Sequence, residues 1–304
     1  MSSKGIKLWL IFFLLGIIWG TSFLWIKIGV DEIGPLSLVA FRLLFGFLGL
    51  LTIATFKRET FGLGGKIAWA FAFMGAFNVV IPFLFISWGE KIVPSGLASV
   101  LNSTMPLFTI IFAHFWLHDE KISLFRIGGL FIGFLGILVL LSEELFQKIS
   151  LLNLLQSNQM ISAQLAVITA AICYAIATTF SRRYLRNQPP LSQSILMMFY
   201  ANIFIWPLAF TMQKPFLFPH SLLTWISVIW LGLLGSCLAY ILYFRLLNEW
   251  GATRSSLTTY VIPMISIFLG VIFLHESLDW RDLIGSFLIL SGVFLVNLKT
   301  NGKP

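Results

Sequence analysis

The chain has 304 residues, of which 58% are hydrophobic and only 11% are charged, and its net charge is +8. A soluble domain carries about 25% charged residues, so this composition excludes a chain that covers itself with polar surface in water. No basic stretch is long enough to follow a phosphate backbone, which argues against nucleic acid as a partner.

Apolar runs of about 20 residues follow one another along the chain, and such runs are long enough to cross a bilayer as helices. We therefore predict an all-α integral membrane protein with ten transmembrane helices. The ten predicted spans are 8–28, 36–56, 67–88, 95–117, 124–142, 163–184, 191–211, 222–244, 252–274 and 279–298. The first run is too long for a signal peptide and lacks a small-residue cleavage site, so we expect no cleaved leader.

The charges outside these spans predict the orientation. If the N-terminus is cytoplasmic and the spans alternate, 14 Lys and Arg residues lie on the cytoplasmic side, five on the outer side, and Arg42 lies within span 2. An excess of Lys and Arg marks the cytoplasmic side. We expect both termini in the cytoplasm, anionic lipid against the basic face, and a bacterial inner (cytoplasmic) membrane as the location.

Polar residues inside the first three spans are candidates for a binding site, because each is costly in a bilayer unless it has a partner or faces water. Arg42 is the most costly, since no carboxylate lies in its span. It either binds an anionic substrate group such as a carboxylate, or it has a structural role near helix ends or the outer interface. Ser22 and Asn78 either contact substrate or join helices.

Spans 4 and 9 each carry a polar cluster directly before a proline. Asn102 and its two polar neighbours precede Pro106, and Thr259 with its neighbours precedes Pro263. A proline inside a helix frees a carbonyl and kinks the helix, and freed backbone at membrane depth is tolerated beside a wet cavity. These clusters are therefore our main candidates for a central site.

Aromatic residues within the predicted spans include Trp19, Trp88, Tyr174 and Tyr240. Aromatic walls suit an amphipathic metabolite, although ordinary core packing explains them equally well.

The second half of the chain repeats the first. The distance from Glu120 to Glu276 is 156 residues (276−120), and that from Pro106 to Pro263 is 157 (263−106). Each half holds five predicted spans, an odd number, so the second half enters the membrane from the opposite side. We predict two inverted five-helix repeats, 1–150 and 151–304, with a site between them and transport by alternating access.

Glycines recur in spans 5 and 10, where Gly129 corresponds to Gly285 and Gly136 to Gly292. Small residues let helices approach closely, so we expect packing surfaces here, and a homodimer through them is left open. Glu120 and Glu276 are expected to form ion pairs or helix caps at the membrane interface.

Taken with the repeat, several local motifs resemble one known family. They are Trp19-Gly20-Thr21-Ser22-Phe23 followed by Lys27, Pro35 with Arg42, the two proline-to-glutamate spans, and Gly251-Ala252-Thr253. Together they resemble the drug/metabolite transporter superfamily, in its ten-helix EamA-type branch. The resemblance implies a helical bundle with both termini inside that carries small metabolites, often amino acids and frequently outward. Small four-helix relatives exchange protons for cationic drugs through a glutamate in their first helix. Span 1 here has no acidic residue, which counts against that activity.

We therefore expect a secondary transporter for a small metabolite, an amino acid or a related amphipathic compound, with export as the direction. The alternatives are a cationic-drug or proton-coupled multidrug efflux carrier, or a membrane scaffold without transport. No catalytic cluster, phosphate-binding loop or metal motif is visible, so we expect no enzyme, cofactor or metal site. Cys173 and Cys237 are expected to pack in spans, and His114 to bond its neighbours or shuttle protons.

Overall fold

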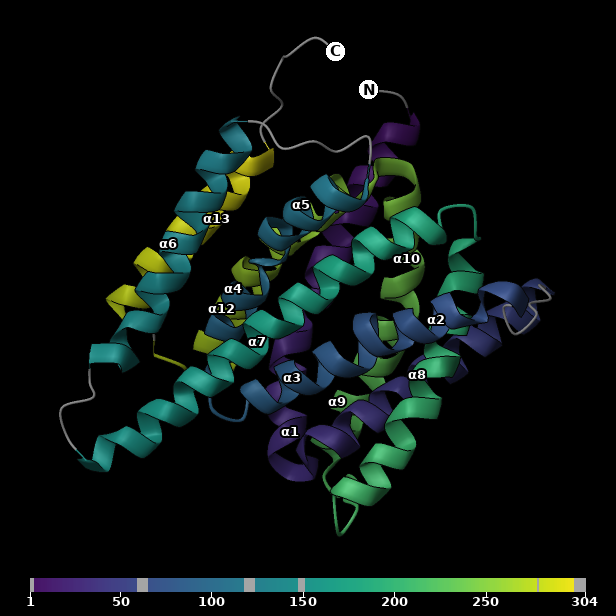
Figure 1. The fold of residues 1–304 in the computed structure, drawn as a ribbon. Helices are drawn as coiled ribbons and strands as arrows, with labels where there is room; N and C mark the ends of the chain where they lie inside the picture. The colour runs from purple at the N-terminus through teal and green to yellow at the C-terminus, as the bar shows by residue number, and fades with distance from the viewer. Residues whose placement is uncertain (1–2, 59–64, 118–123, 147–150, 278, 298–304) are drawn as a thin grey trace.

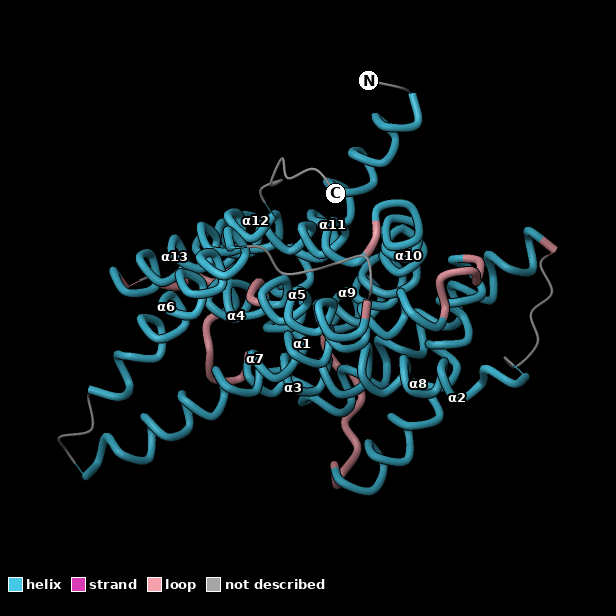
Figure 2. The backbone as a smooth tube through the Cα atoms, turned by 45° about the horizontal axis from the view of Figure 1, so that its top comes forward, coloured by secondary structure: helices cyan, strands magenta, loops and turns pink. Residues whose placement is uncertain are grey.

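The computed structural model describes residues 3–58, 65–117, 124–146, 151–277 and 279–297, and its regular structure within these ranges is entirely helical (Figures 1 and 2). The helices are α1 (Ser3–Lys57), α2 (Ala68–Gly75), α3 (Ile81–Gly89), α4 (Ser95–Asn102), α5 (Met105–Trp116), α6 (Leu124–Phe146), α7 (Leu151–Tyr184), α8 (Pro190–Met212), α9 (Leu222–Gly232), α10 (Ala239–Trp250), α11 (Ala252–Ser256), α12 (Val261–Phe273) and α13 (Trp280–Asn297). Four tighter or wider turns join them: η1 (Gly65–Ile67), η2 (Ala76–Val80), η3 (Leu233–Leu238) and η4 (Leu257–Tyr260).

The described helices have the length and composition of membrane helices. Six stretches qualify by these two measures: Gly5–Lys57, Gly65–Gly89, Ser95–Trp116, Asn158–Tyr184, Pro190–Met212 and Leu222–Trp250. Shorter apolar helices cover Ile127–Leu140 and Leu257–Phe273. The all-helical membrane class is thus supported, whereas ten separate crossings stay a prediction.

The outer surface of the bundle is apolar. Phe56, Phe115 and Leu222 are 85%, 75% and 77% exposed, and many other large apolar side chains face outward. A water-soluble monomer rarely exposes so much contiguous apolar surface, whereas hydrocarbon solvates it.

Helix α1 contains the first two predicted spans because the chain bends between them. Gly34 has φ 71° and ψ 170°, a conformation that L side chains rarely adopt, and Pro35 follows it without a backbone N–H to donate. Both arms of α1 pack against helices of the second half, including α8, α9 and α12. The two halves therefore share one interior, and the predicted boundary at residue 150 stays a prediction.

The predicted proline interruptions are present in spans 4 and 9. Helix α4 ends at Asn102 and α5 begins at Met105, while the 3₁₀ turn η4 directly precedes α12. The two interruptions touch, since the Ser103 hydroxyl donates to the carbonyl of Thr259 at 2.8 Å. The chain thus brings both polar clusters to one place in the bundle.

Two π-turns interrupt spans 3 and 8. They begin at Ala76 and Leu233, which are 157 residues apart (233−76), the same separation as that of the two prolines. Turns of this kind widen a helix by one residue and occur often at functional sites. Nothing in the sequence predicted these two π-turns.

Helices α6 and α13 lie side by side at one flank of the bundle (Figures 1 and 2). A Cβ atom on Gly136 would lie 2.7 Å from the backbone N of Ile289, and one on Gly292 would lie 2.4 Å from that of Gly133. Only glycine permits such close backbone approach, so the predicted role of these glycines in helix packing is confirmed.

Candidate functional site

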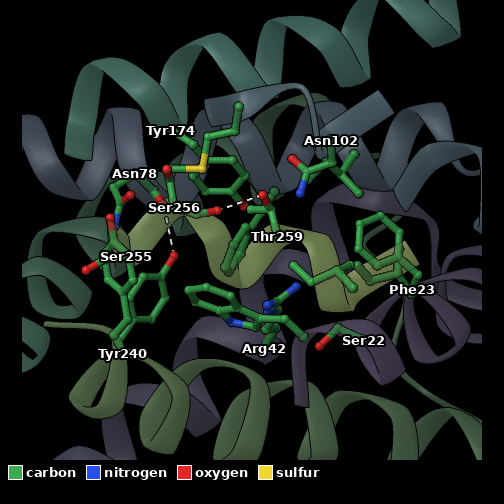
Figure 3. Close-up of a pocket in the computed structure, with 17 residues that line it drawn as sticks. Ser22, Phe23, Arg42, Asn78, Asn102, Tyr174, Tyr240, Ser255, Ser256 and Thr259 are labelled. Atoms are coloured by element: carbon green, nitrogen blue, oxygen red, sulfur yellow. Dashed lines mark hydrogen bonds between the residues drawn. The ribbon is translucent and has the colours of Figure 1, made fainter. Parts of the chain in front are cut away.

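A cavity of about 700 Å³ lies at the centre of the bundle, where the interrupted helices meet. It is lined by Trp19, Ser22, Phe23, Ile26, Arg42, Asn78, Phe83, Ile86, Asn102, Met105, Tyr174, Tyr240, Tyr243, Ser255, Ser256, Thr259 and Ile262. The lining comes from both halves of the chain, and Figure 3 shows the labelled polar side chains arranged around one space.

Eight of the nine predicted site residues line this cavity, and Trp88 does not. Trp88 lies at the end of α3 with 41% of its surface exposed, which places it on the bundle exterior. Its position two residues beyond Ile86 turns it away from the lining face, because neighbours two apart in a helix do not share a face. The functional roles of the other eight stay predictions.

Arg42 supplies the positive charge of the cavity. Its Nε donates to the hydroxyl of Ser236, in η3, at 3.0 Å. Its guanidinium carbon lies 3.6 Å from the ring centroid of Phe83, within the range of a cation–π contact. The side chain is only 4% exposed, so it lies inside the bundle, and its role, substrate contact or structural support, stays a prediction. Among the lining residues no Asp or Glu occurs, so a substrate anion would find its charge partner here.

The polar side chains opposite Arg42 offer hydrogen bonds to a ligand. The Oδ1 atom of Asn102 and the hydroxyl of Ser255 are buried and have no hydrogen-bond partner within the described residues. Thr259 instead donates to the carbonyl of Ser256 at 2.7 Å. Buried polar atoms without partners are uncommon, and a cavity that binds a polar ligand accounts for them.

Aromatic rings form another wall of the cavity. The ring centroid of Trp19 lies 6.1 Å from that of Tyr240 and 5.5 Å from that of Tyr243. Trp19 Nε1 donates to the carbonyl of Gly235 at 3.2 Å, and the Tyr240 hydroxyl donates to that of Asn78 at 2.8 Å. These bonds tie the rings to the two π-turns, so the wall is held in a fixed position.

Some residues that line the cavity were not among the predicted site residues. Ser255 and Ser256 lie four and three residues before Thr259, a spacing that shares one helix face, so helical periodicity could have found them. Phe83 had no such signal, because its place under Arg42 depends on how α3 packs against α1.

Other polar residues of the helices and their ends lie outside the cavity. Asn202 donates to the carbonyls of Leu43 and Met198 at 3.1 and 2.9 Å, which joins two helices. Glu276 accepts hydrogen bonds from the start of α4 and is a helix cap. His114 is half-buried in α5 and is not among the lining residues, whereas Glu120 lies outside the described residues.

No group of three or more potential metal ligands occurs in the described part of the chain. Cys173 and Cys237 are both buried and free.

The sequence matches a known family along nearly its whole length. A model of the EamA-like transporter family matches residues 7–142 and matches again at residues 161–298. The chain belongs to the EamA-like transporter family. Together with its apolar helices, this membership indicates an integral membrane protein.

Curated relatives of this EamA-like chain are named as transporters. A Bacillus subtilis (strain 168) protein named an uncharacterized transporter is 26% identical over 92% of each chain. A Salmonella typhimurium (strain LT2) protein named a probable amino-acid metabolite efflux pump is 24% identical, with 93% of this chain and 92% of that one covered. A protein of known crystal structure superimposes with a TM-score of 0.69 over 96% of this chain and 98% of that one. Because the two sequences are only 18% identical, the similarity to this crystal structure shows a shared fold alone.

Proposed function

We propose that this EamA-like protein is a secondary carrier that binds a small amphipathic metabolite, an amino acid or a related carboxylate, in the central cavity and exports it. The observation that carries the proposal is the lining of that cavity, which combines Arg42, the unpartnered Oδ1 of Asn102 and an aromatic wall. An amino acid presents the matching groups: a carboxylate for the guanidinium, an ammonium donor for the amide oxygen, and an apolar side chain for the rings.

Alternating access is the mechanism that we infer for this carrier. The family model matches the two halves separately, and the π-turns recur at the same separation as the prolines, which supports two related halves around the cavity. If the halves are inverted in the membrane, they can exchange conformations, so that a state open to one side implies a state open to the other. The relative named as an amino-acid metabolite efflux pump supports export and this substrate class.

A cationic-drug carrier fits this cavity less well. A cation would meet the charge of Arg42, and none of the lining residues is an Asp or Glu that could balance it. A bacterial inner membrane with both termini inside remains part of the proposal, supported by the charge asymmetry of the sequence.

The test is transport by purified protein in proteoliposomes. Uptake of labelled amino acids should saturate and should accelerate when unlabelled substrate fills the opposite compartment, because a carrier returns faster when loaded. Arg42→Lys should weaken this transport while leaving folded protein near the parent level, since lysine keeps the charge but loses the planar fork. Arg42→Lys protein that folds and transports normally would contradict carboxylate binding at this residue, and saturable exchange that never appears would contradict the carrier itself.

A further inference from the structure

A buried glutamate lies just beyond one end of the central cavity. Glu90 directly follows the last residue of α3, outside the predicted span, and its backbone N–H donates to the carbonyl of Ile86 at 2.8 Å. Ile86 lines the cavity, so Glu90 is one helical turn farther along the same helix. By the charge pattern, this end of the bundle faces the outside of the cell.

The carboxyl group of Glu90 has no hydrogen-bond partner among the described residues. The residue is 0% exposed, and both of its carboxyl oxygens are buried and unbonded. Buried carboxylates are normally paired or hydrogen-bonded, because an isolated ion in a dry interior is costly. This environment therefore favours the neutral, protonated acid, which is far cheaper to bury than the ion.

The charged groups around Glu90 come from α1 and from the chain after α12. The ammonium group of Lys27 donates hydrogen bonds to the main-chain carbonyls of Glu90 and, at 3.3 Å, of Val93. Burial raises the pKa of the Glu90 carboxyl well above its ordinary value, and Glu276 and Asp31 add to this effect, while Lys27 and Arg42 oppose it. Desolvation is the largest of these influences, so it decides the direction.

Near Glu90, hydrogen bonds join an element of the first half of the chain to one of the second. Glu276 accepts hydrogen bonds from the backbone N–H and hydroxyl of Ser95, at 2.6 and 2.9 Å, and from the N–H of Gly96 at 3.2 Å. These bonds hold the turn between α3 and α4 against the end of α12. If the outer side opens during transport, these ends separate, and water reaches Glu90.

We propose that Glu90 is a proton-binding site: its carboxyl group holds a proton while the outer side is closed and releases that proton to external water when the outer side opens. The O–H bond of the acid breaks on opening, the proton passes to water, and closing takes one proton back. This inference rests on the proposed carrier function, because it requires an outward-open state.

The pH dependence of opening has a definite direction. Because the closed state binds the proton more tightly than the open state, raising the external pH favours opening. Between the pKa values of the two states, the open population should rise by up to about tenfold per pH unit.

The experiment measures opening without any substrate. A single reporter, Ser22→Cys, is placed in the cavity after Cys173 and Cys237 are replaced by alanine, and a membrane-impermeant maleimide is added outside oriented proteoliposomes over a series of external pH values. Thiol reactivity itself rises with pH, so each labelling rate is divided by that of the same reporter in Glu90→Gln, which cannot titrate. We expect this ratio to rise with pH in the parent. In Glu90→Asp the ratio should also rise with pH, but the midpoint of the rise should lie at a different pH.

Glu32→Gln is the matched control. Glu32 lies at the same end of the bundle, but its carboxylate is hydrogen-bonded by Ser221 and Thr224 at the start of α9. Its removal should leave the pH dependence of the ratio unchanged. A ratio that stays flat with pH would overturn the proton site, and so would loss of the pH dependence in Glu32→Gln.

If Glu90→Gln gives no folded protein on size-exclusion chromatography, the pH profile of labelling in Glu90→Asp is compared directly with that in the parent. A shifted midpoint supports the proposal and identical profiles overturn it. Because the labelling needs no substrate, an absence of transport would count against the carrier alone.

Discussion

At the scale of single residues, the cavity is organised around one arginine that is already oriented. The bond from Nε to Ser236 and the contact with Phe83 restrict the rotation of the Arg42 guanidinium before any ligand arrives. Orienting a long side chain in advance reduces the entropy lost on binding. The guanidinium is therefore suited to recognition, and its charge is supported by side chains that only the folded chain brings to it.

Asn102 provides the sharpest test of the polar side of the cavity. Asn102→Ala should weaken substrate binding by about 1–3 kcal/mol, or roughly ten- to hundredfold in affinity, because a polar ligand group would lose its partner. Isothermal titration or concentration-dependent uptake with the transported substrate measures this change.

Asn202→Ala is the control for this substitution, because Asn202 is also an asparagine in a helix but bonds the backbone of two helices outside the cavity. It should lower the melting temperature and leave affinity near the parent value. Equal affinities in Asn102→Ala and the parent would contradict a role for this amide in binding.

At the scale of helices, the interruptions matter more than the continuous segments. The breaks before Pro106 and Pro263 leave backbone groups without regular helical partners, and the Ser103 hydroxyl satisfies one of them across the bundle. The π-turns carry Asn78, which lines the cavity, and Ser236, which accepts the hydrogen bond from Arg42 Nε. Irregular backbone is thus concentrated where the cavity is, which is the condition under which a membrane interior tolerates it.

The contact between α6 and α13 predicts a contrast between two glycines of one helix. In Gly136→Ala the new methyl group would lie 2.8 Å from the carbonyl oxygen of Gly285, so the helices must separate. We expect a loss of about 1–3 kcal/mol of stability, typical of overpacked sites. Thermal unfolding in detergent, followed by fluorescence, measures it.

Gly128→Ala makes the matching change at a position where a Cβ would meet nothing within 4 Å. Alanine is also a better helix former than glycine, so the melting temperature of Gly128→Ala should equal or exceed that of the parent. If both variants unfold at the same temperature, the close contact of the two helices does not stabilise the protein.

At the scale of the whole molecule, the orientation in the membrane is open to direct measurement. Two exposed positions in loops of the second half should lie on opposite sides. Lys214→Cys, between α8 and α9, should react with an impermeant thiol reagent added to intact cells, whereas Asn187→Cys, between α7 and α8, should react only after the membrane is permeabilised. The reverse pattern would overturn the predicted orientation and, with it, the assignment of Glu90 to the outer side.

The sequence by itself determined the class of the protein and much of its site. Runs of apolar residues can only be buried in lipid or protein, so composition alone indicated a helical membrane protein. Polar residues at membrane depth are costly, so a search for them selected Arg42, Asn78 and Asn102, all of which line the cavity. Glycine spacing likewise predicted packing surfaces on spans 5 and 10, and in the structure the helices of these spans, α6 and α13, pack closely against each other.

Only the tertiary structure decided which side chains face one another. Trp88 looked equivalent to Trp19 in sequence, yet it faces outward, because the direction of an aromatic side chain depends on helix rotation. Glu90 looked like an ordinary residue at a helix end, yet the folded chain buries it completely. Phe83 beneath Arg42 and the two π-turns had no sequence signal, since they arise from contacts between segments far apart in the chain.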